Sequence, residues 1–148
     1  MTKVLAISSQ GGHWIQLKRI CPAFEQSSLV MVSTFILPPS LPNSCTNYYS
    51  VVDASRWNKL KLIKQACQVF LVIRKEKPDK IITTGASVGL WAIIAGRLFG
   101  AKTIWLDSIA NFEQISLSGR LAKAFAHIHM TQWSHLITSK TIYKGAVI

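Results

Sequence analysis

Short apolar runs rich in β-branched residues alternate along this chain with segments of helical periodicity, and this alternation most constrains its fold. Residues 4–7 form a continuous apolar run that ends in a glycine turn, which is typical of a strand buried on both faces. Residues 13–24 follow, with apolar side chains at the i, i+3 and i+7 spacing of one helix face. Repeated units of this kind predict a Rossmann-like, mostly parallel α/β sheet with flanking helices.

The rest of the chain continues the same alternation. Further strands are expected at 28–35, 48–52, 81–83, 103–106, 128–131 and 136–138, and further helices at 55–77, 87–99 and 118–126. The segment 37–43 contains three prolines. It is predicted to be irregular, because proline removes an amide donor and fixes φ. No repeat, low-complexity tract or internal boundary interrupts the pattern, so residues 1–148 are expected to form a single domain.

The charge balance narrows the class of partner. The chain has 17 Lys and Arg against 6 Asp and Glu, a net charge of +11. This surplus favours an anionic partner, whether nucleic acid, an acidic membrane face or a phosphorylated ligand. The basic residues are spread along the chain without a helix-turn-helix, RNP or zinc-finger pattern, so nucleic-acid binding is not expected.

The cysteines and most histidines show no catalytic or metal-binding pattern. The cysteines, Cys21, Cys45 and Cys67, are odd in number and read as free thiols in a reducing compartment. The histidines outside the first loop, His127, His129 and His135, read as structural or surface residues. The N-terminus lacks a signal-peptide pattern, and no apolar run approaches the roughly 20 residues of a spanning helix. We therefore expect a cytosolic protein, or one bound to a membrane from the cytosolic side.

Three loops at the expected carboxyl ends of strands hold most of the unusual polar residues, and ligands of such sheets bind at this edge. In the first loop, Gly11 and Gly12 let the backbone approach a ligand and expose amides at a helix N-terminus, which suits a phosphate. His13 follows as a candidate general base. The alternative is a tight turn with a surface histidine. The GxGxxG dinucleotide fingerprint is absent.

The second loop, residues 83–87, repeats this arrangement after the strand at 81–83. The hydroxyls of Thr84 and Ser87 and the backbone amides of Gly85 and Ala86 would lie at a helix N-terminus. Such a group can hold a diphosphate without a cation. Plain helix capping by Ser87 or Thr84 is the alternative interpretation.

The third loop, residues 107–113, holds two of the six acidic residues of the chain. Asp107 either orients a sugar hydroxyl or a neighbouring histidine, or caps a turn. Ser108 and Asn111 lie beside it and could contact the same ligand. No DxD motif is present in the chain.

The expected helix at 55–77 is basic and carries a long apolar stripe. The stripe consists of Trp57, Leu60, Ile63, Cys67, Phe70 and Ile73. A basic helix with an apolar face can lie on an anionic membrane surface. More often such a stripe faces the core, and we predict this for most of it. The apolar surface left over near 69–73 must then meet a membrane or another protein.

Several fragments match, in order and spacing, one family of transferase subunits. The fragments are Ser9 to His13, Pro78-Asp79 before 81–85, 105–110, 117–120, Gln132-Trp133 and 143–145. Together they resemble the acceptor-side subunit of two-component glycosyltransferases, over nearly the whole chain. That family includes the membrane subunit of the dolichol-linked N-acetylglucosaminyltransferase and smaller bacterial exopolysaccharide and capsule proteins. More distantly, the layout is similar to the N-terminal half of the peptidoglycan lipid-linked N-acetylglucosaminyltransferase.

The resemblance implies a GT-B arrangement in which the two Rossmann-like halves are separate chains. A donor-binding glycosyltransferase subunit would hold the UDP-sugar. This chain would hold a polyprenyl-diphosphate-linked saccharide acceptor and dock peripherally on the anionic cytoplasmic face of the plasma membrane. The implied reaction is an inverting sugar transfer in polysaccharide biosynthesis that needs no metal and no other cofactor.

The resemblance also implies roles for single residues. His13 matches the position of the catalytic base, and we assign Asp107 to orienting. The residues expected to bind the acceptor or its diphosphate are Gly11, Gly12, Thr84, Gly85, Ala86, Ser87, Ser108 and Asn111. Asn111 stands where the family often has arginine, and His127 where it often has aspartate, so the identity of the acceptor stays open.

Three alternatives remain at this stage. The chain could be a non-catalytic membrane recruiter of a partner transferase. It could also be a basic nucleic-acid-binding domain, or a stand-alone nucleotide-dependent enzyme of Rossmann type. The absence of GxGxxG argues against the last of these.

Overall fold

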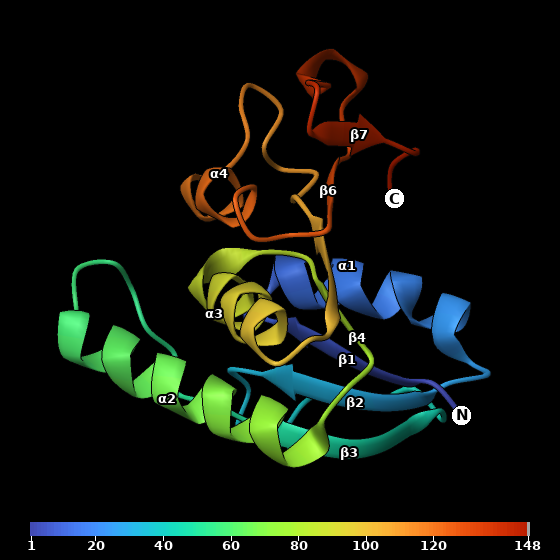
Figure 1. Cartoon of the computed structure of the whole chain (residues 1–148), viewed down its shortest axis with the longest axis vertical. Coiled ribbons are helices and arrows are strands. Elements are labelled where there is room, and N and C mark those ends of the chain that lie inside the picture. Colours follow the sequence, from blue (N-terminus) through green and yellow to red (C-terminus); the bar gives the residue numbers. More distant parts are fainter. Residues whose placement is uncertain (148) are drawn as a thin grey trace.

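The chain forms a seven-stranded sheet in the order β3-β2-β1-β4-β5-β6-β7, and every neighbouring pair is parallel. The computed structural model describes residues 1–147 (Figure 1). The strands are β1 Lys3–Ser8, β2 Ser28–Ser33, β3 Cys45–Ser50, β4 Lys80–Thr83, β5 Lys102–Leu106, β6 Ile128–Thr131 and β7 Thr141–Tyr143. The predicted Rossmann-like parallel sheet is therefore confirmed.

Helices cover both faces of this sheet. The α-helices are α1 Gly12–Ile20, α2 Lys59–Glu76, α3 Ala86–Leu98 and α4 Leu117–Ala122, and two 3-10 helices are η1 Cys21–Phe24 and η2 Ser134–Leu136. Helix α1 packs on one face, whereas α2 and α3 pack on the other. Each face thus has its own apolar core, as the continuous apolar runs of the strands require.

The central strand β1 supplies side chains to both cores. Val4 and Ala6 belong to the core under α1, and Leu5 and Ile7 to the core under α2 and α3. This division follows from the two-residue period of a strand. All four side chains are at most 1% exposed, and burial of each larger one stabilises the fold by about 1.5–3 kcal/mol.

The strand order changes direction between β1 and β4. The chain builds outward from β1 through β2 to β3, and then crosses over to β4 on the other side of β1. Ile7 pairs with Thr83, so the carboxyl ends of these two strands lie side by side. Their outgoing loops diverge to α1 on one face and α3 on the other. Such a switch point opens the crevice where α/β sheets bind ligands.

Two glycines bring α3 close to the sheet. A Cβ at Gly89 would collide with the side chain of Thr83, and one at Gly96 would lie 2.6 Å from Ile81 Cδ1. Any larger residue would push the helix outward. The start of α3 is therefore set closely against the end of β4.

Several element boundaries differ from the predicted ones. The second strand ends at Ser33, the third covers 45–50 with an irregularity opposite Leu29 and Val30, and α4 ends at Ala122. The first helix breaks at Cys21 into the 3-10 helix η1, which has Pro22 in its first turn. These shifts occur where strand pairing or proline geometry overrides the local pattern.

The predicted last strand at 136–138 is wrong. Residues 134–136 form η2, and the final strand is β7 at 141–143. The Thr138 hydroxyl accepts hydrogen bonds from the amides of Lys140 and Thr141, at 3.3 and 3.1 Å. Thr138 therefore lies in a turn that precedes β7, because its hydroxyl satisfies amides that a neighbouring strand would otherwise bind.

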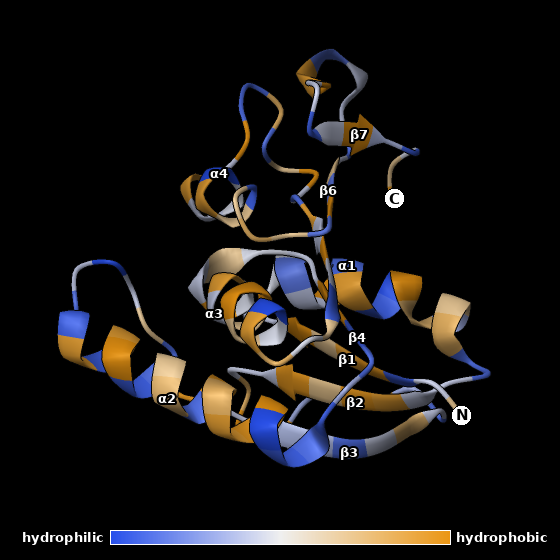
Figure 2. Ribbon diagram, in the orientation of Figure 1, coloured by the Kyte–Doolittle hydropathy of each residue, from blue (hydrophilic) through white to orange (hydrophobic). Residues whose placement is uncertain are grey.

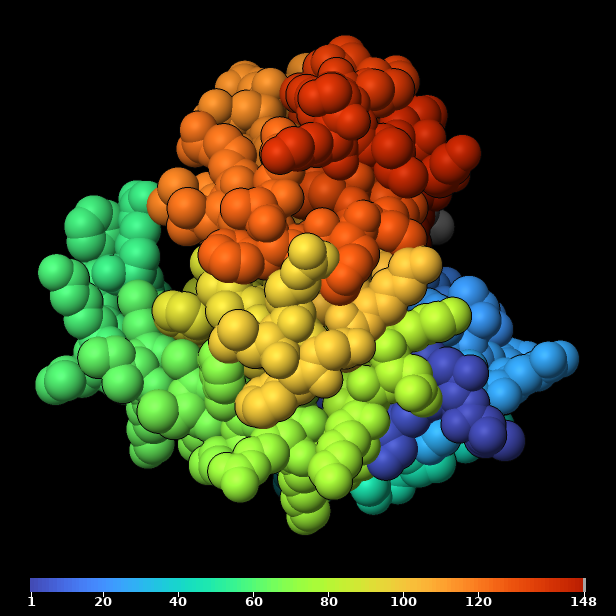
Figure 3. Space-filling view, in the orientation of Figure 1, coloured from blue at the N-terminus to red at the C-terminus, as the bar shows by residue number. Residues whose placement is uncertain are grey.

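The prediction that most of the α2 stripe forms core is also wrong. Trp57 and Leu60 are 82% and 81% exposed, and Ile63 is exposed too. The buried residues of the helix are Gln65, Val69, Ile73 and Glu76. Figures 1 and 3 show why: the amino-terminal half of α2 projects beyond the body of the molecule and has no sheet beneath it. Figure 2 shows apolar and charged bands alternating along this helix.

The start of α2 also differs from the predicted one. The helix begins at Lys59 rather than at 55, and Asn58 caps it, with its side-chain oxygen accepting from the amide of Lys61 at 3.1 Å. No helix within residues 1–147 is both long enough and apolar enough to cross a bilayer.

Candidate functional site

A cavity of about 470 Å³ lies at the carboxyl edge of the sheet, where the segments after β1, β3, β4 and β5 converge. Its lining is mostly small and polar. The lining residues are Ser9, His13, Asp53, Ala54, Arg56, Ala86, Ser87, Ser108, Ala110, Asn111, Ser116, Leu117 and Ser118. This is the predicted edge of the sheet, beside the switch point between β1 and β4.

Two helices begin at this edge without a side-chain cap. The residue before α1 is Gly11, with φ 85°, and the residue before α3 is Gly85, with φ 131°. Neither helix has a side-chain hydrogen bond to its first-turn amides. Uncapped N–H groups at a helix start carry the positive end of the helix dipole and favour an anion.

The His13 imidazole lies between these two helix starts. Its Nδ1 is 3.0 Å from the backbone oxygen of Thr84. A carbonyl only accepts, so Nδ1 carries the proton and Nε2 keeps its lone pair in the neutral ring. Nε2 has no hydrogen-bond partner among residues 1–147, and His13 borders the cavity. A histidine held in this tautomer is suited to accept a proton.

The second loop fixes His13 more than it contacts the cavity. The Thr84 hydroxyl is buried and donates to the backbone oxygen of His13 at 2.7 Å. The Gly85 amide donates to Thr83 Oγ1 at 3.2 Å, and a Cβ on Gly85 would lie 2.9 Å from His13 Cε1. Glycine is therefore needed at 85 both for its φ and to leave room for the imidazole.

The structure divides the predicted site residues into two groups. His13, Ala86, Ser87, Ser108 and Asn111 border the cavity. The others are Gly11, Gly12, Thr84, Gly85 and Asp107, which lie next to these residues in the chain but do not border it. The ligand contacts predicted for both groups stay predictions.

Asp107 is an internal anchor of the third loop. It is 1% exposed, and its two oxygens accept from Trp105 Nε1, Asn111 Nδ2, and the amide and hydroxyl of Ser116, at 2.7–3.1 Å. It has no hydrogen bond with His13. In this structure Asp107 thus shapes the loop from 107 to 116, and Thr84 orients the imidazole.

A buried network of side-chain amides, which sequence reasoning missed, holds the third loop in place. Gln132 Nε2 donates to Gln16 Oε1 at 2.6 Å and to the backbone oxygen of Asp107 at 3.0 Å. Gln16 Oε1 also accepts from the amide of Ile109, and its Nε2 donates to Ser108. The only sequence signal was Gln132-Trp133, a matching fragment with no assigned role.

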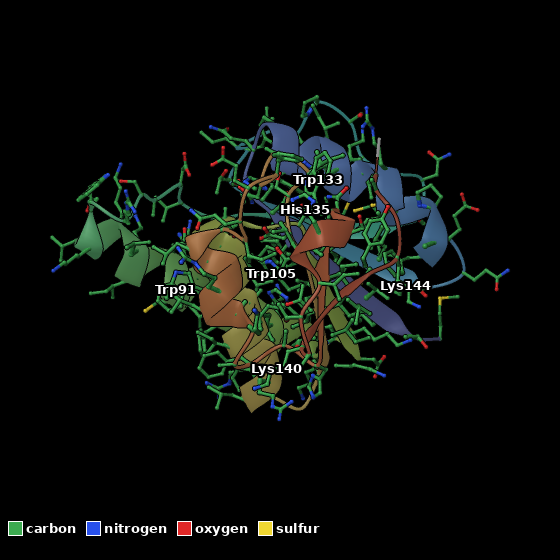
Figure 4. The ribbon with its side chains drawn as sticks, turned by 90° about the horizontal axis from the view of Figure 1, so that it is seen from above. Trp91, Trp105, Trp133, His135, Lys140 and Lys144 are labelled. Atoms are coloured by element: carbon green, nitrogen blue, oxygen red, sulfur yellow. The ribbon has the colours of Figure 1, made fainter. Side chains whose placement is uncertain are left out.

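An aromatic cluster stands beside the same loop. The ring of Phe112 lies 4.8 Å from that of Trp133 and 4.9 Å from that of His135, between centroids. Trp133 Nε1 donates to the backbone oxygen of Ile109 at 2.7 Å. Figure 4 shows Trp133 and His135 adjacent to each other and Trp105 nearer the middle of the molecule. The cluster therefore holds the outer side of the third loop.

The other histidines have structural contacts. His129 is buried, and its Nε2 lies 2.8 Å from the backbone oxygen of Gly119 while Nδ1 lies 2.9 Å from Thr141 Oγ1. Burial lowers the pKa of His129, although the hydrogen bond to Gly119 acts in the opposite direction. Within residues 1–147, no group of three or more His, Cys, Asp or Glu side chains is arranged to hold a metal ion.

A larger cleft of about 740 Å³ lies elsewhere, along η1 and residues 41–44. Cys21 borders it, and burial, with a smaller contribution from nearby Cys45, raises the pKa of this thiol to about 11. The thiol is therefore protonated and unreactive at neutral pH. No α-helix begins at this cleft, so the carboxyl-edge cavity is the better candidate site.

No protein-family model and no curated relative matches the chain. Among solved structures, it is similar to Acinetobacter baumannii MurG, with 13% identity and a TM-score of 0.75 over 97% of this chain and 46% of that one. It is also similar to the UDP-GlcNAc 2-epimerase from Neisseria meningitidis bound to UDP-GlcNAc (10% identity, TM-score 0.69, 99% and 47%). A Rickettsia africae glycosyltransferase gives 12% identity and a TM-score of 0.63 over 97% and 42%.

The chain spans less than half the length of these proteins. At such identities the similarity is one of fold alone. In fold, the chain corresponds to the N-terminal half of GT-B enzymes such as MurG and the UDP-GlcNAc 2-epimerases.

Proposed function

We propose that this chain is the acceptor-side subunit of a two-component, inverting glycosyltransferase. It binds a polyprenyl-diphosphate-linked saccharide and docks on the cytoplasmic face of the plasma membrane. A separate donor-binding subunit supplies the UDP-sugar. The product belongs to a bacterial polysaccharide pathway.

One observation carries the proposal: a histidine with a free Nε2 stands between two uncapped helix starts at the switch point of the sheet. The hydrogen bond from Nδ1 to Thr84 leaves Nε2 as the proton acceptor. The amides at the starts of α1 and α3 offer a place for phosphate oxygens. A base next to an anion site is what transfer to a phosphorylated acceptor needs.

The assigned roles follow from this geometry. His13 removes the proton from the acceptor hydroxyl as that oxygen attacks the anomeric carbon of the donor sugar. The bond from that carbon to the UDP oxygen breaks, and UDP leaves on the partner's side. Positioned base catalysis of this kind contributes about 10²–10⁴-fold to the rate.

The names of the similar structures support a sugar-nucleotide enzyme. One is MurG, one is described as bound to UDP-GlcNAc, and one is a Staphylococcus aureus MnaA–UDP structure. All are more than twice as long as this chain. In this proposal a separate subunit supplies the other half of the cleft.

The exposed stripe of α2 supports membrane docking. Trp57, Leu60 and Ile63 project from the body of the molecule, and Lys59, Lys61 and Lys64 lie among them. Burying the apolar side chains in the interface would stabilise binding, and each nearby lysine adds about 1 kcal/mol on an anionic leaflet.

The deciding experiment co-expresses the chain with the proposed donor-binding subunit. Sugar transfer to a polyprenyl-diphosphate-linked acceptor is then assayed in membranes, with each protein alone as the control. We expect transfer only when both are present. Turnover by this chain alone, or no complex and no transfer from any common nucleotide-sugar, would refute the proposal.

His13→Asn tests the base. The asparagine amide can retain the hydrogen bond to Thr84, but it cannot accept the proton, so kcat should fall about 10²-fold or more. His135→Asn is the matched control, because His135 is exposed and does not border the cavity, and the kcat of this variant should stay near that of the wild type.

His13→Asn also distinguishes the proposed catalytic subunit from the alternative, a non-catalytic membrane recruiter. A non-catalytic recruiter, which the exposed α2 stripe would also suit, would lose little turnover in His13→Asn. It would lose activity when Trp57 and Leu60 are replaced by serine and the complex leaves the membrane.

A further inference from the structure

One side chain at the mouth of the cavity has no assigned role. Among the described residues that border the cavity, Arg56 is the sole Lys or Arg. It lies in the connection between β3 and α2. Of the 17 Lys and Arg in the chain, it is thus the one at the proposed acceptor site.

The Arg56 guanidinium has no acidic partner of its own. Within residues 1–147, the one salt bridge joins Lys3 to Glu76, and no hydrogen bond from the Arg56 side chain is present. Its Cζ lies over the ring of Trp57, 4.7 Å from the centroid. Stacking on an aromatic face restrains a guanidinium but leaves its N–H edge free to bind an oxyanion.

Arg56 also marks the border between the cavity and the apolar stripe of α2. Trp57 follows it directly, and Leu60 and Ile63 continue the exposed stripe. A ligand whose phosphates reach Arg56 can therefore run its lipid along this stripe while its saccharide enters the cavity.

We propose that Arg56 binds the diphosphate of the lipid-linked acceptor at the membrane edge of the cavity, held in place by Trp57. The inference rests on the proposed function and adds a binding residue to it. Planar N–H groups match two phosphate oxygens, which a lysine cannot do. His13 in the first turn of α1 and Ala86 and Ser87 at the start of α3 border the same cavity, so the free amides there can bind the same group.

Asp53 is the one carboxylate at this cavity and opposes an anion there. It also borders a neighbouring hollow of about 360 Å³ together with Lys61. No salt bridge joins Asp53 to Arg56 within residues 1–147, so the Arg56 guanidinium stays available for the ligand.

The test uses vesicle binding by the full chain. One set of neutral phosphatidylcholine vesicles contains farnesyl diphosphate, and a second set contains phosphatidylglycerol at equal negative charge. We expect the wild type to prefer the diphosphate vesicles. Arg56→Gln should lose about tenfold in affinity for them and little for the phosphatidylglycerol vesicles. Arg56→Lys should fall between the two.

Lys59→Gln is the matched control, since Lys59 lies three residues along on the same projecting segment and does not border the cavity. It should weaken binding to both vesicle sets by the same small factor. Arg56 is exposed, so Arg56→Gln and Arg56→Lys should keep the melting temperature of the wild type. An equal loss on both vesicle sets in Arg56→Gln, or no loss, would overturn the inference.

A soluble arm distinguishes the source of the diphosphate. UDP and inorganic pyrophosphate are titrated into the wild type and Arg56→Gln. A loss of UDP affinity without a loss on the farnesyl diphosphate vesicles would assign Arg56 to the nucleotide and overturn the inference. If Arg56→Gln behaves as wild type while His13→Asn abolishes transfer, the inference alone fails. If the wild type shows no diphosphate preference and the pair transfers nothing, the proposed function fails.

Discussion

The four α-helices begin in two different ways. Helices α2 and α4 have side-chain caps, from Asn58 to the Lys61 amide and from Ser116 to the Gly119 amide. Helices α1 and α3 start after Gly11 and Gly85 and have none. The uncapped pair begins at the carboxyl ends of β1 and β4, beside His13.

The two kinds of helix start serve different purposes, one stabilising the helix and the other leaving amides free for a ligand. A capped start satisfies its own amides and stabilises the helix by about 1 kcal/mol. A glycine start leaves the amides for water or a ligand, and its positive φ turns the chain sharply into the helix. The glycine starts thus leave amides free beside the site, whereas the start of α4, which borders the cavity through Ser116, has its Gly119 amide bonded within the chain.

The largest effect is expected for Gly85→Ala. At φ 131° and ψ −168°, position 85 lies in a region that only glycine occupies readily, and the new Cβ would press on His13. The free energy of unfolding should fall by about 2–3 kcal/mol in urea denaturation. In Gly12→Ala, where a Cβ would meet nothing within 4 Å, it should change by less than about 1 kcal/mol. Equal effects would mean that position 85 has no special geometry.

Asp107→Asn should cause the next largest loss in the free energy of unfolding. Asparagine places an amide where one carboxylate oxygen accepts two hydrogen bonds, so the buried donors of Trp105, Asn111 or Ser116 lose their partner. We expect a loss of about 2 kcal/mol in the free energy of unfolding. Asp53→Asn, at an exposed carboxylate, should stay within about 0.5 kcal/mol of the wild type. A stable Asp107→Asn protein that has lost transfer would restore a direct catalytic role for Asp107.

Asn58→Ala tests the capped class directly. It removes the hydrogen bond to the Lys61 amide and should lower the free energy of unfolding by about 1 kcal/mol. Asn43→Ala, at an exposed residue in the irregular loop, is the control and should be close to neutral. Membrane binding should also weaken, because the start of α2 carries the exposed stripe; unchanged binding would move the docking surface elsewhere.

The smallest effect concerns pH. Burial lowers the pKa of His129 below its ordinary value of 6.5, so the folded state favours the neutral ring. The stabilisation is complete above pH 6.5 and is lost as the pH falls through the lowered pKa, because the unfolded chain binds the proton first. Urea denaturation at several pH values should show this slope, and His129→Gln should reduce it. An unchanged slope would place the titrating group elsewhere, with His127 the next candidate.

The local pattern predicted the site edge but not its internal contacts. The runs at 4–7 and 81–83 are strands, and the glycines after them do open helices. The exposed amino-terminal half of α2 was missed, because periodicity reports an apolar face without saying what lies opposite it. Asp107 was predicted at the right edge, yet its burial depends on Ser116 and Trp105, whose contacts come from the folded loop.

The sequence by itself determined the alternation of strands and helices, the parallel sheet, and the three loops at its carboxyl edge. Hydrophobic period, glycine turns and proline breaks are local, so a short window of residues carries them. Only the tertiary structure decided the tautomer of His13, through Thr84 71 residues away, and the joining of Gln16 to Gln132 across 116 residues. It also buried Glu76 against Tyr49, Asn47 and Lys3. Such contacts depend on which segments the sheet order places side by side, and no local sequence pattern encodes that order.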